Sequence, residues 1–241
     1  MSDTLESVLA SKRDAHLSQL IDLLRIPSVS TDPALRGEVR RAAEWLRDDL
    51  AGHGFETQLL ETGGHPAVVA RRHPHPGGPT VLIYGHYDVQ PADPIDLWDS
   101  DPFEPVVKDG QIVARGASDD KGQVFAHVKG AQVLIEAEGE LPLNVTFLIE
   151  GEEEIGSKNL AATLEKHKDL LAADVALVSD GAMLPGSVPT LTYGLKGLAY
   201  VELRVRTANR DLHSGGFGGS VPNAAMAVAE IVSKLKDQNG R

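Results

Sequence analysis

Apolar residues recur along this chain with two periods, one typical of helices and the other typical of strands. Apolar positions three or four residues apart predict helices over residues 5–24, 38–50, 121–138, 157–168 and 222–236. Short apolar or alternating runs predict strands over residues 56–60, 67–71, 81–84, 111–114, 143–149, 174–179 and 198–207. Strands and helices alternate through the middle of the chain. This order predicts an α/β fold with a mostly parallel central sheet flanked by helices.

The hydrophobic pattern changes near residue 195. Residues 198–207 alternate between apolar and polar side chains, as in a sheet with one exposed face, whereas the earlier strands are apolar on both faces. We therefore expect one domain over residues 1–194 and the beginning of an α+β domain over residues 195–241. The second segment is too short to bury a core of its own, so we expect that the chain is part of a longer protein or is completed by a partner.

Residue types that bind metal ions follow three of the predicted strands and precede one of the predicted helices. These residues are His86, Asp88, Asp119, Asp120, Glu152, Glu153, Glu154 and Asp180. In an open α/β sheet, ligands bind beyond the carboxyl ends of the strands, so these side chains can converge on one point. Neutral imidazole with several carboxylates is a ligand set for Zn²⁺, Mn²⁺ or a related divalent ion, singly or as a pair.

Each of these residues has a plainer interpretation when it is taken alone. Asp119 and Asp120 could stabilise a helix N-terminus, and the three glutamates could form a solvated acidic turn. His213, in a glycine-rich loop, could be an ordinary loop histidine or could donate a hydrogen bond to a substrate oxygen. The helical histidines His16, His127 and His167 are predicted to be surface residues. The metal-centre hypothesis therefore depends on the joint pattern.

Composition excludes several other functions. The net charge of −12 argues against a nucleic-acid partner and against an anionic membrane surface. The chain has no cysteine, so it forms no disulfide and has no thiolate ligand for a metal. Its N-terminus is polar and is not a signal peptide, and no apolar run approaches the roughly 18 residues that span a bilayer. We therefore expect a cytoplasmic protein.

Several sequence motifs occur together in this chain. They lie at residues 26–30, 84–91, 98–103, 114–122, 150–157, 179–180 and 210–219. With these motifs the chain resembles the di-metal aminoacylase/carboxypeptidase superfamily of metallopeptidases, and within it the carnosinase-type cytosolic dipeptidases. The glycine-rich loop DLHSGGFGG favours the dipeptidase branch over the deacylases.

The resemblance implies hydrolysis of dipeptides or short peptides by a water that two metal ions activate, with Zn²⁺ as the usual metal and Mn²⁺ as the alternative. It implies metal ligands at His86, Asp119, Glu154 and Asp180. Asp119 would bridge the two ions, and its peptide bond to Asp120 would be cis. Glu153 would be the general base, and Asp88 would orient His86.

The resemblance also gives roles to the two predicted segments. Residues 1–194 would form the N-terminal part of a catalytic metal-binding domain. Residues 195–241 would begin a lid and dimerisation domain, from which His213 would act on the substrate in a homodimer. A late metal-binding histidine and a substrate-binding arginine of the superfamily have no counterpart here, so we expect the chain to be inactive at this length. An N-acyl amino acid deacylase with the same site and a non-catalytic metal-binding fragment remain alternatives.

Overall fold

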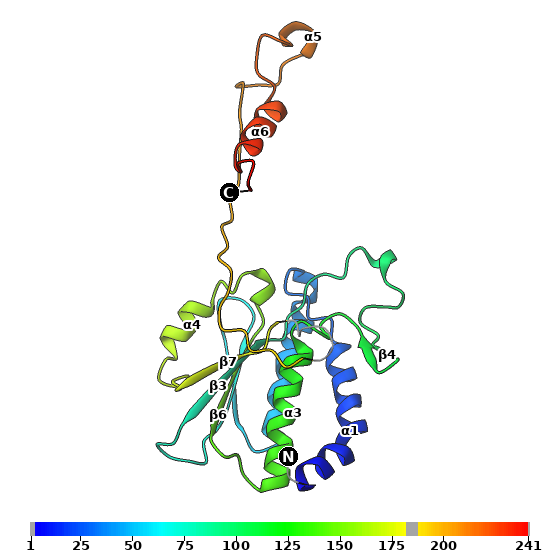
Figure 1. Cartoon of the computed structure of the whole chain (residues 1–241), viewed down its shortest axis with the longest axis vertical. Coiled ribbons are helices and arrows are strands. Elements are labelled where there is room, and N and C mark those ends of the chain that lie inside the picture. The colour runs from blue at the N-terminus through cyan, green and yellow to red at the C-terminus, as the bar shows by residue number, and fades with distance from the viewer. Residues whose placement is uncertain (1–2, 182–187, 241) are drawn as a thin grey trace. The chain divides into compact units, whose positions relative to one another are not determined.

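The computed structural model describes residues 3–181 and 188–240, which belong to two units, Met1–Ser187 and Val188–Arg241. The first unit holds a five-stranded sheet with helices packed against it (Figure 1).

The helices of the first unit are α1 (Asp3–Leu24), α2 (Arg36–Gly52), α3 (Lys121–Glu138) and α4 (Leu160–Lys166), with short 3₁₀ helices η1 (Pro33–Leu35), η2 (Ile95–Leu97) and η3 (Glu153–Ile155). The strands are β1 (Glu56–Leu60), β2 (Ala67–Arg72), β3 (Thr80–His86), β4 (Val106–Lys108), β5 (Gln111–Val113), β6 (Asn144–Glu150) and β7 (Val175–Val178). Every helix and strand predicted for this unit is present. None of the helices in the described part of the chain is long and apolar enough to cross a membrane.

One strand of the first unit, β4, was not predicted. It pairs antiparallel with β5 through a turn at Asp109 and Gly110, which have φ angles of 52° and 76°. A two-residue Asp-Gly turn is a strong hairpin signal, because both positions need a positive φ. The sequence therefore contained the information for β4, although its apolar run is very short.

The large sheet has the strand order β1-β2-β6-β3-β7. β3 is parallel to both β6 and β7, whereas β1 pairs antiparallel with β2 and β2 pairs antiparallel with β6. The sheet is therefore mixed, and the prediction of a mostly parallel sheet was wrong in this respect. The physical reason is the connection over residues 61–66, which is long enough to join antiparallel neighbours but too short for a parallel crossover.

β3, β6 and β7 are parallel, so their carboxyl ends lie on the same side of the sheet. In the observed register His86 lies opposite Glu150 on β6, and Tyr84 lies opposite Val178 on β7. Asp180, two residues beyond Val178, therefore lies near the level of His86. An open α/β sheet binds its ligands at these carboxyl ends of its strands.

The core has two parts, one on each face of the sheet. On one face, α1, α2 and α3 pack against alternate residues of the strands, including Val68, Ala70 and Phe147. On the other face, residues such as Val69 and Leu148 pack with side chains from the α4 region. Successive side chains of a strand point to opposite faces, so both faces of β2 and β6 can be buried at once.

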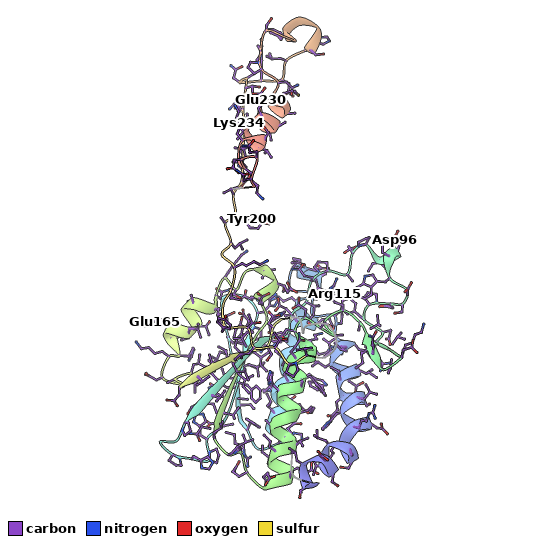
Figure 2. The ribbon with its side chains drawn as sticks, in the orientation of Figure 1. Asp96, Arg115, Glu165, Tyr200, Glu230 and Lys234 are labelled. Atoms are coloured by element: carbon purple, nitrogen blue, oxygen red, sulfur yellow. The ribbon has the colours of Figure 1, made fainter. Side chains whose placement is uncertain are left out.

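The second unit has little regular structure among its described residues. It contains α5 (Ser214–Phe217) and α6 (Ala224–Ser233) but no strand over residues 198–207, so the prediction of a strand there was wrong. The side chain of Tyr200 is 93% exposed, and Figure 2 shows it projecting from an extended segment. An alternating sequence forms a strand only when a neighbouring strand pairs with its backbone. No lid domain is evident in residues 188–240.

Candidate metal centre

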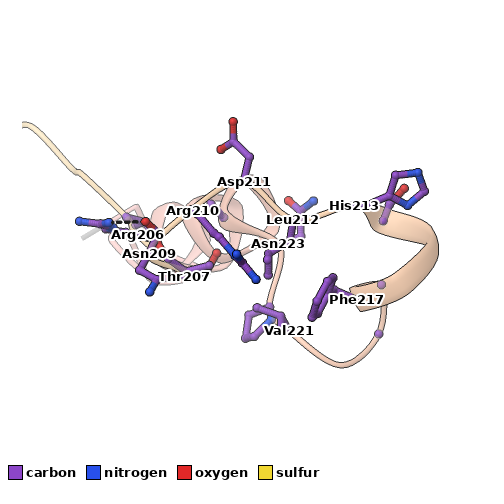
Figure 3. A pocket seen from close by; sticks show the side chains of 17 residues that line it. Arg206, Thr207, Asn209, Arg210, Asp211, Leu212, His213, Phe217, Val221 and Asn223 are labelled. Atoms are coloured by element: carbon purple, nitrogen blue, oxygen red, sulfur yellow. Dashed lines mark hydrogen bonds between the residues drawn. The ribbon is translucent and has the colours of Figure 1, made fainter.

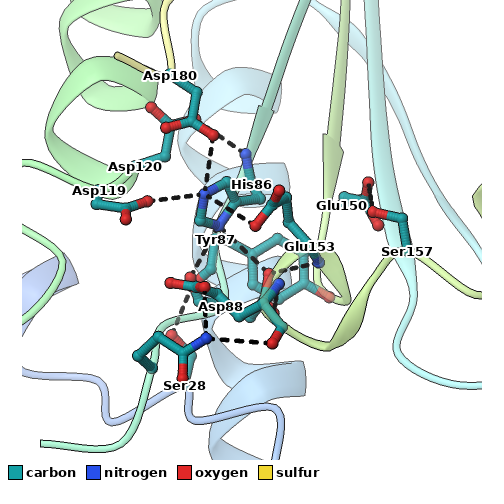
Figure 4. Close-up of polar contacts among 12 residues, drawn as sticks. Ser28, His86, Tyr87, Asp88, Asp119, Asp120, Glu150, Glu153, Ser157 and Asp180 are labelled. Atoms are coloured by element: carbon teal, nitrogen blue, oxygen red, sulfur yellow. Dashed lines mark hydrogen bonds and ion pairs between the residues drawn. The ribbon is translucent and has the colours of Figure 1, made fainter. Parts of the chain in front are cut away.

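The centre of the site is His86, the last residue of β3. Its side chain is fully buried, and its Nε2 atom lies 3.0 Å from an oxygen of Asp119 and 3.6 Å from an oxygen of Asp180. Figure 4 shows both carboxylates directed at this nitrogen. The potential ligand atoms of the three residues all lie within 4.8 Å of one another. The structure thus brings together residues that are far apart in the sequence.

The two carboxylates reach His86 from different elements. Asp119 lies just before α3, whose N-cap is Asp120, and the peptide bond between these two residues is cis, as the resemblance implies. The side chain of Asp119 is 61% exposed and that of Asp180 is 29% exposed. The group therefore has a buried imidazole beneath two carboxylates that solvent can reach.

Asp88 organises the other side of the imidazole. The Nδ1 atom of His86 lies 3.0 Å from the backbone oxygen of Asp88 and 3.4 Å from its carboxylate. The two carboxylate oxygens of Asp88 also accept hydrogen bonds from the backbone N–H groups of Glu153 and Glu154, at 3.2 and 3.1 Å. One buried carboxylate thus orients both the histidine and the turn that carries the two glutamates.

The three consecutive glutamates lie in three different environments. A carboxylate oxygen of Glu153 lies 4.0 Å from Nε2 of His86. The carboxylate of Glu154 instead accepts a hydrogen bond from the side chain of Gln90 at 2.7 Å, and it is not part of the group around His86. Glu152 is buried, and both its oxygens accept from the side-chain amide of Asn159, at 3.0 and 2.9 Å. Only Glu153 therefore faces the centre directly.

A glycine makes room for the buried carboxylate of Glu152. A Cβ atom at Gly64 would lie 1.9 Å from an oxygen of Glu152, so no other residue fits there without movement of the loop or of the glutamate. Glu152 thus stabilises the packing of this loop and is turned away from His86.

The charges around His86 favour a bound cation. Burial opposes the protonated imidazole, but the carboxylates of Asp88 and Asp120 outweigh this effect and raise the pKa of His86 to about 10. Burial, opposed by His86, raises the pKa of Asp120 to about 7, and one oxygen of this carboxylate is buried without a hydrogen-bond partner. Such a surplus of negative charge around an imidazole fits a divalent metal ion, which supplies positive charge.

Residues outside the centre hold its loop in place. The hydroxyl of Ser28 donates to the backbone oxygen of Tyr87 at 2.6 Å, and the N–H of Val89 donates to the oxygen of Ser28 at 3.0 Å. The buried side chain of Lys121 donates to the backbone oxygens of Ile26 and Leu23, at 2.6 and 3.2 Å. These bonds explain why the motif over residues 26–30 accompanies the metal-binding motifs.

The helical histidines His16, His127 and His167 were predicted to be surface residues, but all three are half-buried. His127 also has a partner near the site, because its Nε2 atom lies 2.6 Å from the hydroxyl of Ser179. Burial lowers its pKa. Its helical position gave no signal of this partner, because the contact depends on Ser179, the residue directly after β7, meeting α3 in the folded protein.

His213 lies in the second unit. Its ring nitrogen accepts a hydrogen bond from the N–H of Gly215 at 3.0 Å, and His213 is the N-cap of α5. Figure 3 shows it beside a cavity of about 750 Å³ that is lined within this unit by residues between Val205 and Ala224. Arg206, on the wall of the cavity, donates to the backbone oxygens of Ala208 and Asn209, each at 2.9 Å.

Residues 82–240 match the model of peptidase family M20/M25/M40. The chain belongs to this family. The Cys-Gly metallodipeptidase dug1 of Schizosaccharomyces pombe is 35% identical over 99% of this chain and 53% of its own length. The Beta-Ala-His dipeptidase of Homo sapiens is 32% identical over 94% of this chain and 48% of its own length. A solved structure of the dipeptidase Dug1p from Saccharomyces cerevisiae has a TM-score of 0.79 at 29% identity, covering 99% of this chain and 53% of that one.

These similarities confirm the family that the motifs indicated. The chain spans about half the length of the M20 relatives that it matches. M20 enzymes use two metal ions, and the group of His86, Asp119 and Asp180 could hold a metal ion.

Proposed function

We propose that this chain carries the metal centre and the general base of a metallopeptidase that hydrolyses dipeptides or other short peptides. The observation that carries the proposal is the meeting of His86, Asp119 and Asp180 at one point, with the carboxylate of Glu153 4.0 Å from the same imidazole nitrogen. Membership of the M20 family and similarity to proteins named as dipeptidases support the choice of reaction.

The donor set fits two divalent ions, with Zn²⁺ as the first choice and Mn²⁺ as the alternative. His86 and Asp180 would each hold one ion, and the two oxygens of Asp119 would bridge the pair. Glu154 would complete the ligand set. Its carboxylate would give up the 2.7 Å hydrogen bond that it accepts from Gln90 and would bind a metal ion instead. When bound, the ions would supply Lewis acidity, which polarises a peptide carbonyl and makes water more acidic.

Glu153 would act as the general base. Its carboxylate would take a proton from the attacking water and return it to the leaving amine. Burial, together with the carboxylates of Glu154 and Asp180, outweighs the opposing effect of His86 and raises the pKa of Glu153. A raised pKa makes this carboxylate a better proton acceptor near neutral pH. Asp88 would keep Glu153 in place through the backbone of the turn.

We infer further that residues 195–241 begin a lid and dimerisation domain. The support is the glycine-rich loop over residues 210–219, one of the motifs on which the resemblance rests. In this proposal His213 would polarise the scissile carbonyl of a substrate bound to a second subunit of a homodimer. The cytoplasmic location likewise remains a prediction from the sequence.

Metal binding by single variants tests the proposed centre. The chain would be stripped of metal with a chelator and titrated calorimetrically with Zn²⁺. We expect the wild-type chain to bind two ions and Asp119→Ala to lose both, because one carboxylate serves two ions. His86→Ala should weaken the binding of one ion more than that of the other. Asp96→Ala, which removes an exposed carboxylate of η2, is the matched control and should leave binding unchanged.

Two results would contradict the proposal. Full retention of one ion by Asp119→Ala would exclude a bridging role. Equal binding by the wild-type chain and Asp119→Ala would exclude the centre itself. Assays with dipeptides and with N-acyl amino acids, each with added Zn²⁺ or Mn²⁺, would separate a peptidase from a deacylase by the substrate that is hydrolysed faster.

A further inference from the structure

β7, the strand that leads to Asp180, is supported on one side only among the described residues. It is the last strand in the sheet order and pairs only with β3, and all four of its residues are exposed. Before the strand, Asp174 and Thr80 exchange hydrogen bonds of 2.8 and 2.9 Å. These contacts fix β7 along its whole length, from Val175 to Val178. They do not fix the segment beyond it, which carries Asp180.

The side chain of His127 reaches that segment from α3. Its Nε2 atom lies 2.6 Å from the hydroxyl of Ser179, the residue directly before Asp180. Apart from the ion pair of Asp180 with His86, this is the one side-chain hydrogen bond in the described part of the chain that joins residues 175–181 to another element. A neutral imidazole has one donor and one acceptor nitrogen, so it can pair with a hydroxyl in either direction.

The same helix also places the other carboxylate of the centre. α3 begins at Lys121, directly after the Asp119–Asp120 pair. Asp119 and Asp180 lie 3.0 and 3.6 Å from the same nitrogen of His86, so their separation depends on how α3 and the end of β7 are held together. Divalent ions bind tightly only when the ligand spacing is correct to a few tenths of an ångström.

We propose that His127 is a positioning residue of the metal centre, because its hydrogen bond to Ser179 fixes Asp180 relative to Asp119. This inference rests on the proposed function, since it assumes that the two aspartates bind a metal ion. It goes beyond that function by giving a role to a side chain on α3 that touches neither the ion nor a ligand.

The test measures Zn²⁺ affinity of the full 241-residue chain by competition with a chromophoric chelator. The variants are His127→Leu, Ser179→Ala and the double variant. Groups that orient metal ligands typically contribute 10–100-fold to affinity, and we expect each single variant to weaken binding about 10-fold. The double variant should lose no more than either single one, because both changes remove the same hydrogen bond. The visible absorption spectrum of bound Co²⁺ should change in the same variants, since it reports ligand geometry.

Two further variants separate positioning from general stability. His127→Gln places an amide near the position of Nε2 and should restore most of the affinity, whereas a loss of packing alone would not be corrected by this change. His16→Leu alters another half-buried helical histidine and should bind Zn²⁺ like the wild type. Thermal unfolding of each metal-free variant shows that it is folded. Ser179→Ala, the smaller change, carries the test if His127→Leu does not fold.

The possible failures of the two proposals can be told apart. If His127→Leu and Ser179→Ala bind Zn²⁺ as tightly as the wild type while Asp119→Ala does not bind it, the positioning role is wrong and the metal centre stands. Additive losses in the double variant would also overturn the positioning role. If the wild-type chain itself binds no Zn²⁺, both the inference and the proposed function fail.

Discussion

Glu152 and Glu153 are neighbours in the sequence, but the fold gives them different surroundings. Glu152 is buried beneath Gly64 and receives both its hydrogen bonds from Asn159. Glu153 is half-buried and faces His86. A general base must reach the proton that it removes, so the position of Glu153 supports its proposed role as the base over that of Glu152.

In a form of the protein that hydrolyses dipeptides, Glu153→Gln should lower kcat by about 10²–10⁴-fold, the usual contribution of a general base. Zn²⁺ affinity should change little, because the amide does not disturb the ligands proposed here. The matched change Glu152→Gln should leave kcat close to the wild-type value. A larger loss in Glu152→Gln, measured by steady-state kinetics, would show that the base has been misassigned.

The half-buried histidine of α3, His127, gives a prediction about the pH dependence of stability. Burial lowers the pKa of His127 below its usual value of 6.5, so the unfolded chain takes up a proton at a higher pH than the folded protein does. The free energy of unfolding therefore falls as the pH drops from the usual pKa of 6.5 toward the lower pKa of the folded protein. Between about pH 7 and about pH 5, the wild type should lose unfolding free energy faster than His127→Gln, by at most about 1.4 kcal/mol per pH unit. Urea unfolding of the metal-free proteins measures this difference, and parallel curves would contradict it.

At the scale of elements, a buried ion pair joins α2 to α3. The ammonium group of Lys129 lies 2.6 Å from the carboxylate of Asp49, with side chains only 6% and 10% exposed. Gln132 bonds to both partners, and Lys129 also lies over the rings of Trp45 and Phe125. α3, which begins just after Asp119 and Asp120, is thus held to α2 by an ion pair as well as by apolar packing.

Removal of one partner of this pair should be costly. Lys129→Met leaves the carboxylate of Asp49 buried with only Gln132 to bond to it, and we expect a loss of about 3–5 kcal/mol in the free energy of unfolding. The double variant Lys129→Met, Asp49→Leu should recover much of that loss, because no buried charge remains. Urea unfolding gives both values. A double variant that is less stable than the single one would show that the pair itself is strongly stabilising.

At the scale of the whole molecule, the chain covers about half of the length of the dipeptidases of Schizosaccharomyces pombe, Homo sapiens and Saccharomyces cerevisiae compared above. The exposed edge of β7 carries apolar side chains, with Val175 58% and Val178 56% exposed. Exposed apolar edge strands are usually covered by another strand or by a loop. The late metal-binding histidine and the substrate-binding arginine that the resemblance implies also have no counterpart among the 241 residues given.

These observations predict low activity for the 241-residue chain by itself. With Zn²⁺ or Mn²⁺ added, its dipeptide hydrolysis should be at least about 10²-fold slower than that of an M20 relative of full length, since the loss of even one positioned catalytic group has an effect of this size. The measurement is an assay of released amino acid at matched protein concentrations. Comparable rates would show that the other half of the relatives is dispensable and would overturn the proposed role of a late histidine.

The sequence by itself determined the α-helices of the first unit and all of its strands except β4. The helix over 121–138 and the strand over 56–60 have the predicted ends, because their periodicity is a local property of the chain. It also placed His86 and Asp180 at the ends of strands, and the motifs indicated the M20 family. All of these inferences depend on residues that are close together in the sequence.

Only the tertiary structure decided which of these residues meet. It turned Glu152 and Glu154 toward Asn159 and Gln90, left Glu153 facing His86, and joined His127 to the end of β7. It also made half of the sheet antiparallel and left residues 198–207 without a strand. The physical reason is that side-chain partners and strand pairing depend on which elements become neighbours. Burial and hydrogen bonding over the whole fold decide which elements are neighbours, and the periodicity of a single segment does not predict them.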